Sequence, residues 1–274
     1  MVVFPNAKIN IGLDILRRRP DGYHDISTVM VPVPWCDILE IVPAKGSETT
    51  LTVTGRAVDC TAEKNLVMKA YRHLDREVPL PPVDIYLHKI IPDGAGLGGG
   101  SADATFTLRA LNEMFALEIS DRRLAEIAAG LGADCPFFVY NRPMLAEGIG
   151  ERQHPVDIPA LSSMSVAIVK PPISISTAEA YANIVPAQPA MPLESVIGLP
   201  PERWQALAVN AFQRPIARRH PVLERLLEAL RDAGAVYTSM SGSGSAVFGL
   251  WYGDILAEQI DLPDGCDIFC GRLG

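Results

Sequence analysis

The chain has 274 residues, of which 48% are hydrophobic and 20% are charged, and its formal net charge is −8. A chain of this length suits one large domain or two small ones, and its hydrophobic content is sufficient for a buried core. No run of five or more basic residues occurs, so non-specific binding to nucleic acid is not expected. An anionic ligand would have to be held by local features against the overall charge.

The beginning of the chain shows no basic segment followed by an apolar run, so no signal peptide is predicted. The longest charge-free apolar-rich stretch near the middle, residues 158–169, is too short to span a bilayer. The cysteines are odd in number and scattered, which predicts reduced thiols in a cytoplasmic protein: Cys36, Cys60, Cys135, Cys266 and Cys270. Cys266 and Cys270 have no second pair or nearby histidine, so we expect no zinc site.

The first predicted elements are a short strand at residues 2–4 and a second strand at residues 5–13. In the second, apolar residues alternate with polar ones, so Lys8 and Asn10 point to the same side. Periodicity alone favours a solvated strand face for these two residues. A turn marked by Pro20-Asp21-Gly22 follows, with Tyr23 and His24 at its exit. Such a pair could stack on a planar base, although it could equally serve only for packing.

Residues 37–42 alternate as a strand, and residues 49–54 resemble its hairpin partner. A helix is predicted from Glu63 to about Arg76, ended by prolines, and residues 83–91 form a strand. Five glycines then fall between Gly94 and Gly100, before a helical pattern. Glycine-rich backbone at the start of a helix can bring amide groups onto an anion. We interpret this segment as a phosphate-binding loop, the alternative being a hairpin or linker.

Two other glycine loops do not fit this segment. The spacing Gly94-x-Gly96-x-x-Gly99 matches a dinucleotide-binding pattern, but that pattern requires an acidic residue at the end of a second strand. Here the acid at the right distance, Glu118, follows a helical pattern. A nucleoside triphosphate-binding P-loop requires Lys-Ser or Lys-Thr where Gly100-Ser101 stands. In the helix after the loop, Ser101 or Asp103 lies in the first turn, where it could cap the amides or support an anion.

Another helix is predicted from Asp121 to Leu131, and Asp134 follows among small and apolar residues. Asp134 is either the N-cap of a short helix with Pro136 or a functional acid. A hairpin turn at residues 146–151 precedes a junction at residues 155–159.

The second half of the chain has a strand at residues 165–169, a helix that starts at Ser176, and a proline-rich segment at residues 186–201 that we expect to be a surface loop. Helices are predicted at residues 204–212 and 221–233, with a strand at residues 235–238. A second small-residue loop, residues 239–245, then leads into a strand, and its alternative is a simple glycine-serine hairpin.

Two small-residue loops, an acid and a lysine together suit phosphoryl transfer, in which the protein mainly positions the reactants and neutralises charge. The segment from Pro92 to Ala104 resembles the phosphate loop of the galactokinase, homoserine kinase, mevalonate kinase and phosphomevalonate kinase superfamily. The segments at residues 7–10 and 241–245 resemble its first and third motifs. Within it, residues 8–10, 19–24, 132–138 and 146–151 most resemble kinases that act on 4-diphosphocytidyl-2-C-methylerythritol in the non-mevalonate route to isoprenoids. The similarity extends over about residues 3–250.

The resemblance implies a catalytic pair, Lys8 and Asp134, with Asp134 facing the hydroxyl of the substrate. It implies ATP and Mg²⁺, with Ser101 as a ligand that could help hold the metal. The implied ATP-binding residues are Pro92, Asp93, Gly94, Ala95, Gly96, Leu97, Gly98, Gly99, Gly100, Ser101, Ala102, Asn65 and Lys89. The implied residues for a substrate containing cytidine diphosphate are Asn10, Tyr23, His24 and Tyr181. Ala102 departs from the family, which commonly has a second serine there.

The fold that the resemblance implies is α+β, with the active site in a cleft between two parts. Residues 1–155 would form the ATP-binding domain, similar to the second domain of a small-subunit ribosomal protein. Residues 156–274 would form a ferredoxin-like, substrate-side domain. We expect a cytoplasmic monomer or homodimer whose partners are small molecules, not nucleic acid or membrane. Two alternatives remain, namely another kinase of the superfamily, such as homoserine or phosphomevalonate kinase, and a non-catalytic ligand sensor on the same fold.

Overall fold

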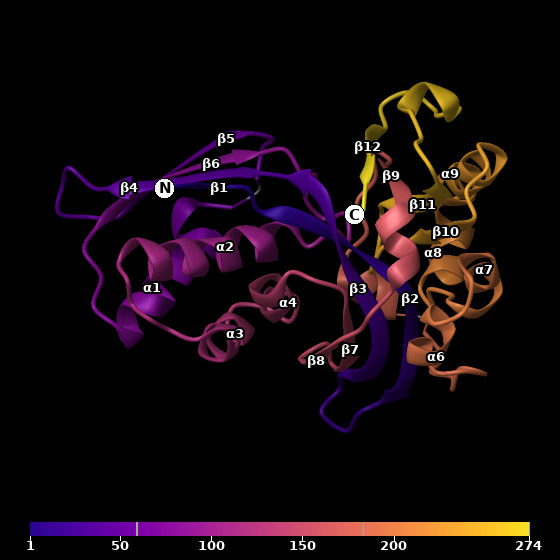
Figure 1. Ribbon diagram of the computed structural model, residues 1–274, viewed down its shortest axis with the longest axis horizontal. Helices are drawn as coiled ribbons and strands as arrows, with labels where there is room; N and C mark the ends of the chain where they lie inside the picture. Colours follow the sequence, from indigo (N-terminus) through magenta and orange to yellow (C-terminus); the bar gives the residue numbers. More distant parts are fainter. Residues whose placement is uncertain (59, 183, 274) are drawn as a thin grey trace. The chain divides into compact units, whose positions relative to one another are not determined.

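The computed structural model describes residues 1–58, 60–182 and 184–273 (Figure 1). The chain forms two compact units, each built from several stretches of sequence. The first unit comprises residues 1–7, 35–93 and 98–142, and the second comprises residues 8–34, 94–97 and 143–274. These units group residues that lie close together in space, and each combines several stretches of the chain. The predicted domain boundary after residue 155 therefore stays a prediction.

The first unit has a four-stranded sheet in the order β1-β4-β6-β5. Its strands are β1 (Val2–Val3), β4 (Ile38–Pro43), β5 (Thr50–Gly55) and β6 (Val83–Lys89). Strand β6 alternates between buried and more exposed residues, so the sheet has one face toward the core. The hairpin predicted between residues 37–42 and 49–54 is wrong. Strand β5 pairs in parallel with β6, which lies between it and β4, because the helix between β5 and β6 returns the chain to the same end of the sheet.

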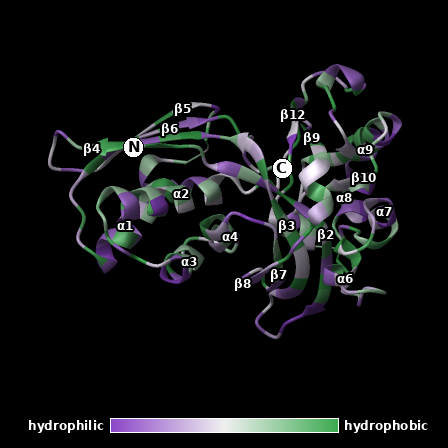
Figure 2. Ribbon diagram, in the orientation of Figure 1, coloured by the Kyte–Doolittle hydropathy of each residue, from purple (hydrophilic) through white to green (hydrophobic). Residues whose placement is uncertain are grey.

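Helices cover one face of this sheet (Figure 1). They are α1 (Leu66–Glu77), α2 (Gly99–Met114), α3 (Asp121–Ala129) and α4 (Cys135–Tyr140), with a 3-10 turn, η1 (Ala62–Lys64), before α1. Hydrophobic and hydrophilic residues alternate around α1, which is seen as bands of green and purple in Figure 2. The apolar stripe of α1, including Leu74, joins Leu39 and Ile85 of the sheet and Leu108 of α2 in one core.

The second unit contains two four-stranded sheets. The first, in the order β2-β3-β7-β8, consists of β2 (Asn6–Arg18), β3 (His24–Cys36), β7 (Met144–Gly148) and β8 (Arg152–Pro155). Strands β7 and β8 form the predicted hairpin. The other sheet, in the order β10-β11-β9-β12, consists of β9 (Met164–Lys170), β10 (Tyr237–Met240), β11 (Val247–Tyr252) and β12 (Asp267–Arg272), and its pairs are antiparallel.

The α-helices of the second unit lie in the chain between β9 and β10. They are α5 (Thr177–Tyr181), α6 (Leu193–Ile197), α7 (Trp204–Leu207), α8 (Gln213–Arg219) and α9 (Val222–Asp232), with 3-10 turns η2 (Pro159–Ser163), η3 (Pro201–Arg203) and η4 (Ala257–Gln259). The apolar face of α9, including Leu226 and Leu230, packs with Val169 and Val247 of the sheet. The helix predicted at residues 221–233 is confirmed, because its apolar residues recur at helical spacing.

Two expectations in the second unit are wrong. The proline-rich segment is not only a surface loop, because α6 lies in it and buries Leu193 and Val196. The helix predicted over residues 204–212 ends at Leu207. The next residues are extended because their backbone pairs with β2: Leu13 donates to the carbonyl of Val209, and Ala211 donates to the carbonyl of Leu13. Periodicity within one segment carries no information about such a distant partner.

No helix in the described part of the chain is both long and apolar enough to cross a membrane.

Candidate active site

Strand β2 carries Lys8 and Asn10 on the same side, as their spacing predicts. The Lys8 Nζ donates to Asn10 Oδ1 at 2.7 Å, and Asn10 Nδ2 donates to Thr28 Oγ1 at 3.0 Å. Both side chains are buried, with exposed fractions of 3% for Lys8 and 2% for Asn10. The expectation of a solvated strand face is therefore wrong. A buried ammonium requires polar partners, and here the strand itself provides one of them.

The ammonium of Lys8 also reaches the glycine-rich loop. Its Nζ donates to the carbonyl of Gly96 at 3.0 Å, and its backbone N–H donates to the carbonyl of Leu97 at 2.9 Å. The hydroxyl of Ser241, in the second small-residue loop, donates to the same carbonyl of Gly96 at 2.8 Å. Both loops predicted from the sequence thus meet at one carbonyl beside Lys8, within the second unit.

Gly96 is required at this meeting point. Its φ of +74° lies in the left-handed region, and a Cβ atom added to it would lie 2.0 Å from the carbonyl oxygen of Ser241. Gly96 therefore serves close backbone packing as well as any contact with a ligand.

Helix α2 begins at Gly99, immediately after the loop, and Gly98 at its N-cap has no side chain. Among the described residues no side chain caps this terminus, so an anion could satisfy the first amide groups. The predicted capping by Ser101 or Asp103 is wrong for both residues. The hydroxyl of Ser101 hydrogen bonds with the thiol of Cys135, and burial raises the pKa of that thiol to about 11. Ala102 is buried, so its methyl group belongs to the core of the first unit.

A pocket of about 160 Å³ lies near this terminus in the first unit. Its lining includes Asn65, Lys89, Asp93, Gly100 and Asp103, of which all but Asp103 were predicted to bind ATP. Asn65 also has a structural task, because its Oδ1 accepts the N–H of Val67 at 2.9 Å and caps α1.

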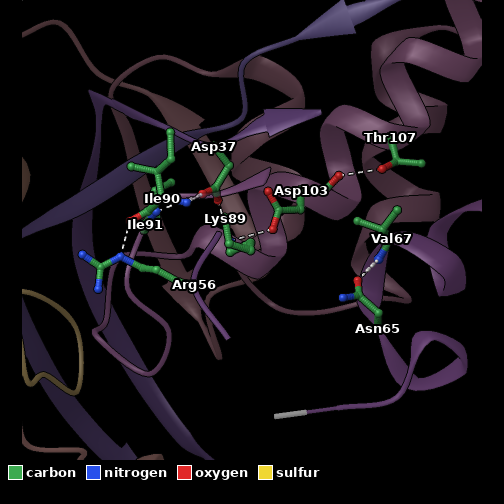
Figure 3. Close-up of polar contacts among 9 residues, drawn as sticks. All are labelled: Asp37, Arg56, Asn65, Val67, Lys89, Ile90, Ile91, Asp103 and Thr107. Atoms are coloured by element: carbon green, nitrogen blue, oxygen red, sulfur yellow. Dashed lines mark hydrogen bonds and ion pairs between the residues drawn. The ribbon is translucent and has the colours of Figure 1, made fainter. Parts of the chain in front are cut away.

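The ammonium of Lys89 lies between two buried carboxylates (Figure 3). It donates to Asp37 Oδ2 at 2.5 Å and to Asp103 Oδ2 at 2.8 Å. Asp37 is fully buried, and its Oδ1 accepts the backbone N–H groups of Ile90 and Ile91 at 2.5 and 2.9 Å. Asp37 thus fixes both Lys89 and the chain that leads into the glycine-rich loop.

This cluster has one more carboxylate than ammonium groups, which affects its protonation. Burial raises the pKa of Asp103 to about 7 against the opposing effect of Lys89. Burial by itself would lower the pKa of Lys89, but Asp103 and Asp37 outweigh it, so that pKa is raised and the ammonium stays charged. Asp103 Oδ1 is buried without a hydrogen-bond partner in the described part of the chain, which agrees with a carboxyl group that burial disfavours as an anion.

Asp134 lies in the first unit at the N-cap position of α4, with Pro136 in the first turn of the helix. Its side chain makes no capping hydrogen bond to the helix in the structure as described. Asp134 thus occupies the N-cap position without the side-chain bond, and its catalytic role stays a prediction.

The predicted residues for the cytosine lie in the second unit. The rings of His24 and Tyr181 are stacked, with centroids 4.8 Å apart and an interplanar angle of 27°. The rings of Tyr181 and Phe212 also pack edge to face, with centroids 4.8 Å apart and an interplanar angle of 77°. Tyr23 is 61% exposed, and its backbone N–H donates to Asp21 Oδ1 within the turn. The structure thus brings His24 and Tyr181 together, while Tyr23 presents its ring to solvent.

Sequence reasoning missed three residues around these sites. Asp37 read as the first residue of a strand, Asp103 as a helix cap, and Asn210 as part of a helix. The signal for Asp37 and Asp103 was Lys89 itself, because a lysine at a buried strand position needs carboxylate partners.

Comparisons with known proteins identify the family of this chain. Two family models match, described as GHMP kinases N terminal domain, over residues 65–142, and GHMP kinases C terminal, over residues 202–258. The 4-diphosphocytidyl-2-C-methyl-D-erythritol kinase of Parabacteroides distasonis is 46% identical over 273 residues, covering 100% of both chains. The enzyme of the same name from Bacteroides fragilis is 47% identical over 272 residues and covers 98% of both chains. The chain belongs to this kinase family.

A crystal structure of a 4-(cytidine 5′-diphospho)-2C-methyl-D-erythritol kinase is 34% identical in sequence, with a TM-score of 0.77. The match covers 93% of this chain and 91% of that one. The α+β fold of the GHMP kinase superfamily, predicted from the sequence motifs, is thereby confirmed.

Proposed function

We propose that the chain transfers the γ-phosphoryl group of ATP to the 2-hydroxyl of 4-diphosphocytidyl-2-C-methyl-D-erythritol, in the non-mevalonate route to isoprenoids. The observation that carries this proposal is the fixed ammonium of Lys8. It is buried and bonded to Asn10 Oδ1 and to the carbonyl of Gly96 in the glycine-rich loop. A positive charge held at that loop would offset charge on the transferred group. Family membership gives the substrate.

The remaining roles follow from the residue types. Asp134 would orient the substrate hydroxyl and accept its proton late in the transfer, as the hydroxyl oxygen bonds to the γ-phosphorus and the bond to the β-phosphate oxygen breaks. The products would be ADP and the phosphorylated substrate. The loop from Pro92 to Ala102, with Asn65 and Lys89, would bind ATP. Asn10 would position the methylerythritol end, while Tyr23, His24 and Tyr181 would hold the cytosine.

Magnesium is part of the proposal. Among the described residues no group of three or more His, Cys, Asp or Glu side chains could hold a metal ion by itself. This fits Mg²⁺, which proteins commonly bind through one or two ligands together with substrate phosphates and water. The Ser101 hydroxyl, in the first turn of α2, would be the protein ligand, and the metal would shield the phosphate charges when bound.

The cellular setting follows from the cysteines. An odd and scattered set of five suits a reducing compartment, so we place the protein in the cytoplasm.

A coupled assay of ADP release tests the function. Purified protein with ATP and Mg²⁺ should turn over the cytidyl substrate, and should not turn over homoserine or phosphomevalonate at comparable concentrations. Turnover of either of the latter without turnover of the cytidyl substrate would overturn the substrate assignment. Absence of turnover with all three, in protein that binds ATP, would favour a non-catalytic sensor.

A further inference from the structure

Asn210 occupies a junction between three parts of the second unit. It is 1% exposed and lies in the extended segment between α7 and α8. The backbone on either side of it pairs with Leu13 of β2, the strand that carries Lys8 and Asn10. Its side chain bonds a different part of the unit: Nδ2 donates to the carbonyl of Met240, at the end of β10, at 2.7 Å and to the carbonyl of Gly242 at 2.8 Å. Asn210 therefore connects β2 to the small-residue loop at residues 241–245.

Asn210 itself is held rigidly. Its Oδ1 accepts the N–H of Phe212 at 2.9 Å, so the orientation of the amide is defined and Nδ2 is directed at the two carbonyls. The nearby Tyr237 hydroxyl donates to the carbonyl of Ala208 and accepts the N–H of Gly12, which adds a second connection between β2 and this segment. A buried amide with its donors and acceptor all bonded is suited to fixing a loop in one position.

The loop held by Asn210 contacts the partner of Lys8. Ser241 Oγ donates to the carbonyl of Gly96, the same oxygen that accepts from Lys8 Nζ. The N–H of Ala246, at the other end of the loop, donates to the carbonyl of Ala95. The loop therefore fixes residues 95 and 96 from both of its ends, and these residues in turn hold the ammonium.

We propose that Asn210 is a positioning residue for the transfer. It acts through the loop at residues 241–245 and the carbonyl of Gly96 to fix the ammonium of Lys8. This inference rests on the proposed function, in which Lys8 offsets charge that develops during the transfer. Such a residue should affect the transition state more than substrate binding, because a small displacement of a charged group lowers the chemical rate.

The chain offers a matched control in Gln205. Strand β10 is at the edge of its sheet, and the side chains of Gln205 and Gln213 bond backbone groups of Thr238 and Met240 on its outer side. Gln205 Oε1 accepts the N–H of Thr238 at 2.8 Å, and its Nε2 donates to the carbonyl of Thr238 at 3.3 Å. Gln205 and Asn210 thus both bond β10 through a side-chain amide, but of these two only Asn210 bonds Gly242 in the loop.

The experiment compares Asn210→Ala, Gln205→Ala and Ser241→Ala in the full chain. For Asn210→Ala we expect kcat to fall by roughly tenfold or more, with the KM for both substrates within about threefold of the wild type. Gln205→Ala should lower Tm but leave kcat unchanged. Ser241→Ala should lower kcat in the same direction, and the double variant should be no worse than Asn210→Ala alone, because both act through one contact.

A wild-type kcat in folded Asn210→Ala, an equal loss of kcat in Gln205→Ala, or additive losses in the double variant would overturn the proposal. If Asn210→Ala does not fold, Ser241→Ala tests the proposal instead. A wild-type kcat in Ser241→Ala would contradict an effect of residues 241–245 on Lys8 through the carbonyl of Gly96. Amide hydrogen exchange tests, without any substrate, whether Asn210 fixes the loop at residues 241–245. The amides of residues 95–97 and 241–246 should exchange faster in Asn210→Ala than in Gln205→Ala. Equal protection in the two variants would show that Asn210 does not fix these residues, whatever substrate the enzyme phosphorylates.

Discussion

The imidazole of His24 stacks on the phenol ring of Tyr181, 157 residues later in the chain, with centroids 4.8 Å apart. The two rings are in direct contact, so a cytosine lying between them would have to separate them. The ring of Tyr181 also packs edge to face against Phe212, and His24 is the first residue of β3. The stack thus brings together two of the residues that we propose hold the cytosine.

Replacing Tyr181 by leucine should raise the KM for the cytidyl substrate by roughly tenfold, because one stacked ring contributes about 1–3 kcal/mol to the binding of a base. The KM for ATP should change little, since the stack belongs to the substrate side in our proposal. Steady-state kinetics with each substrate varied in turn would measure both. Tyr252→Leu is the control, because this ring is 50% exposed and its hydroxyl bonds Glu202. Equal effects on both KM values would argue against a base site at Tyr181.

Asp134→Asn should lower kcat by about 10²–10⁴-fold, because the amide cannot accept a proton from the substrate hydroxyl. Binding of ATP should be close to that of the wild type, because in our proposal Asp134 faces the substrate hydroxyl, and the Tm reports whether the variant is folded. ADP release, calorimetric titration with an ATP analogue and thermal unfolding would measure the three quantities. A variant that retains more than a tenth of the wild-type kcat would remove Asp134 from the catalytic role.

Gly96→Ala should destabilise the protein far more than Gly94→Ala. Both glycines have positive φ, +74° and +58°, so each alanine carries a strain of about 1–2 kcal/mol. A Cβ at Gly96 would also lie 2.0 Å from the carbonyl oxygen of Ser241, whereas one at Gly94 would meet nothing within 4 Å. Urea unfolding would compare the two free energies. Equal losses would mean that the two small-residue loops do not pack at Gly96 in solution.

Asp103→Asn should change how stability depends on pH. The reference pKa of an aspartate in an unfolded chain is about 3.9, whereas that of Asp103 in the fold is raised to about 7, mainly by burial, despite Lys89. Between these values the folded state holds a proton that the unfolded state has released, so the free energy of unfolding falls as pH rises from about 4 to 7. The variant lacks this group and should lose less stability over that range.

Urea unfolding at several pH values between 4 and 8 would measure this difference. Asp121→Asn, an exposed acid in the first turn of α3, is the control and should keep the wild-type profile. If the profiles of Asp103→Asn and the wild type run parallel, the folded protein does not hold a proton on Asp103 between about pH 4 and 7.

The sequence by itself determined those features that depend on neighbouring residues. Alternation placed Lys8 and Asn10 on one side of β2, helical spacing identified α9, and the glycines located the loop before α2. The motifs also identified the kinase family, because several specific short segments in a fixed order can be read from the sequence without knowledge of the tertiary structure.

Only the tertiary structure decided how distant segments pair. The parallel pairing of β5 with β6, the burial of Lys8 and the extended segment around Asn210 each depend on partners far along the chain. The same holds for Asp37 and Asp103, whose carboxylates are buried because both bond the ammonium of Lys89. Periodicity reports which face of an element is apolar, but the free energy of a buried charge is set by the groups that folding brings to it.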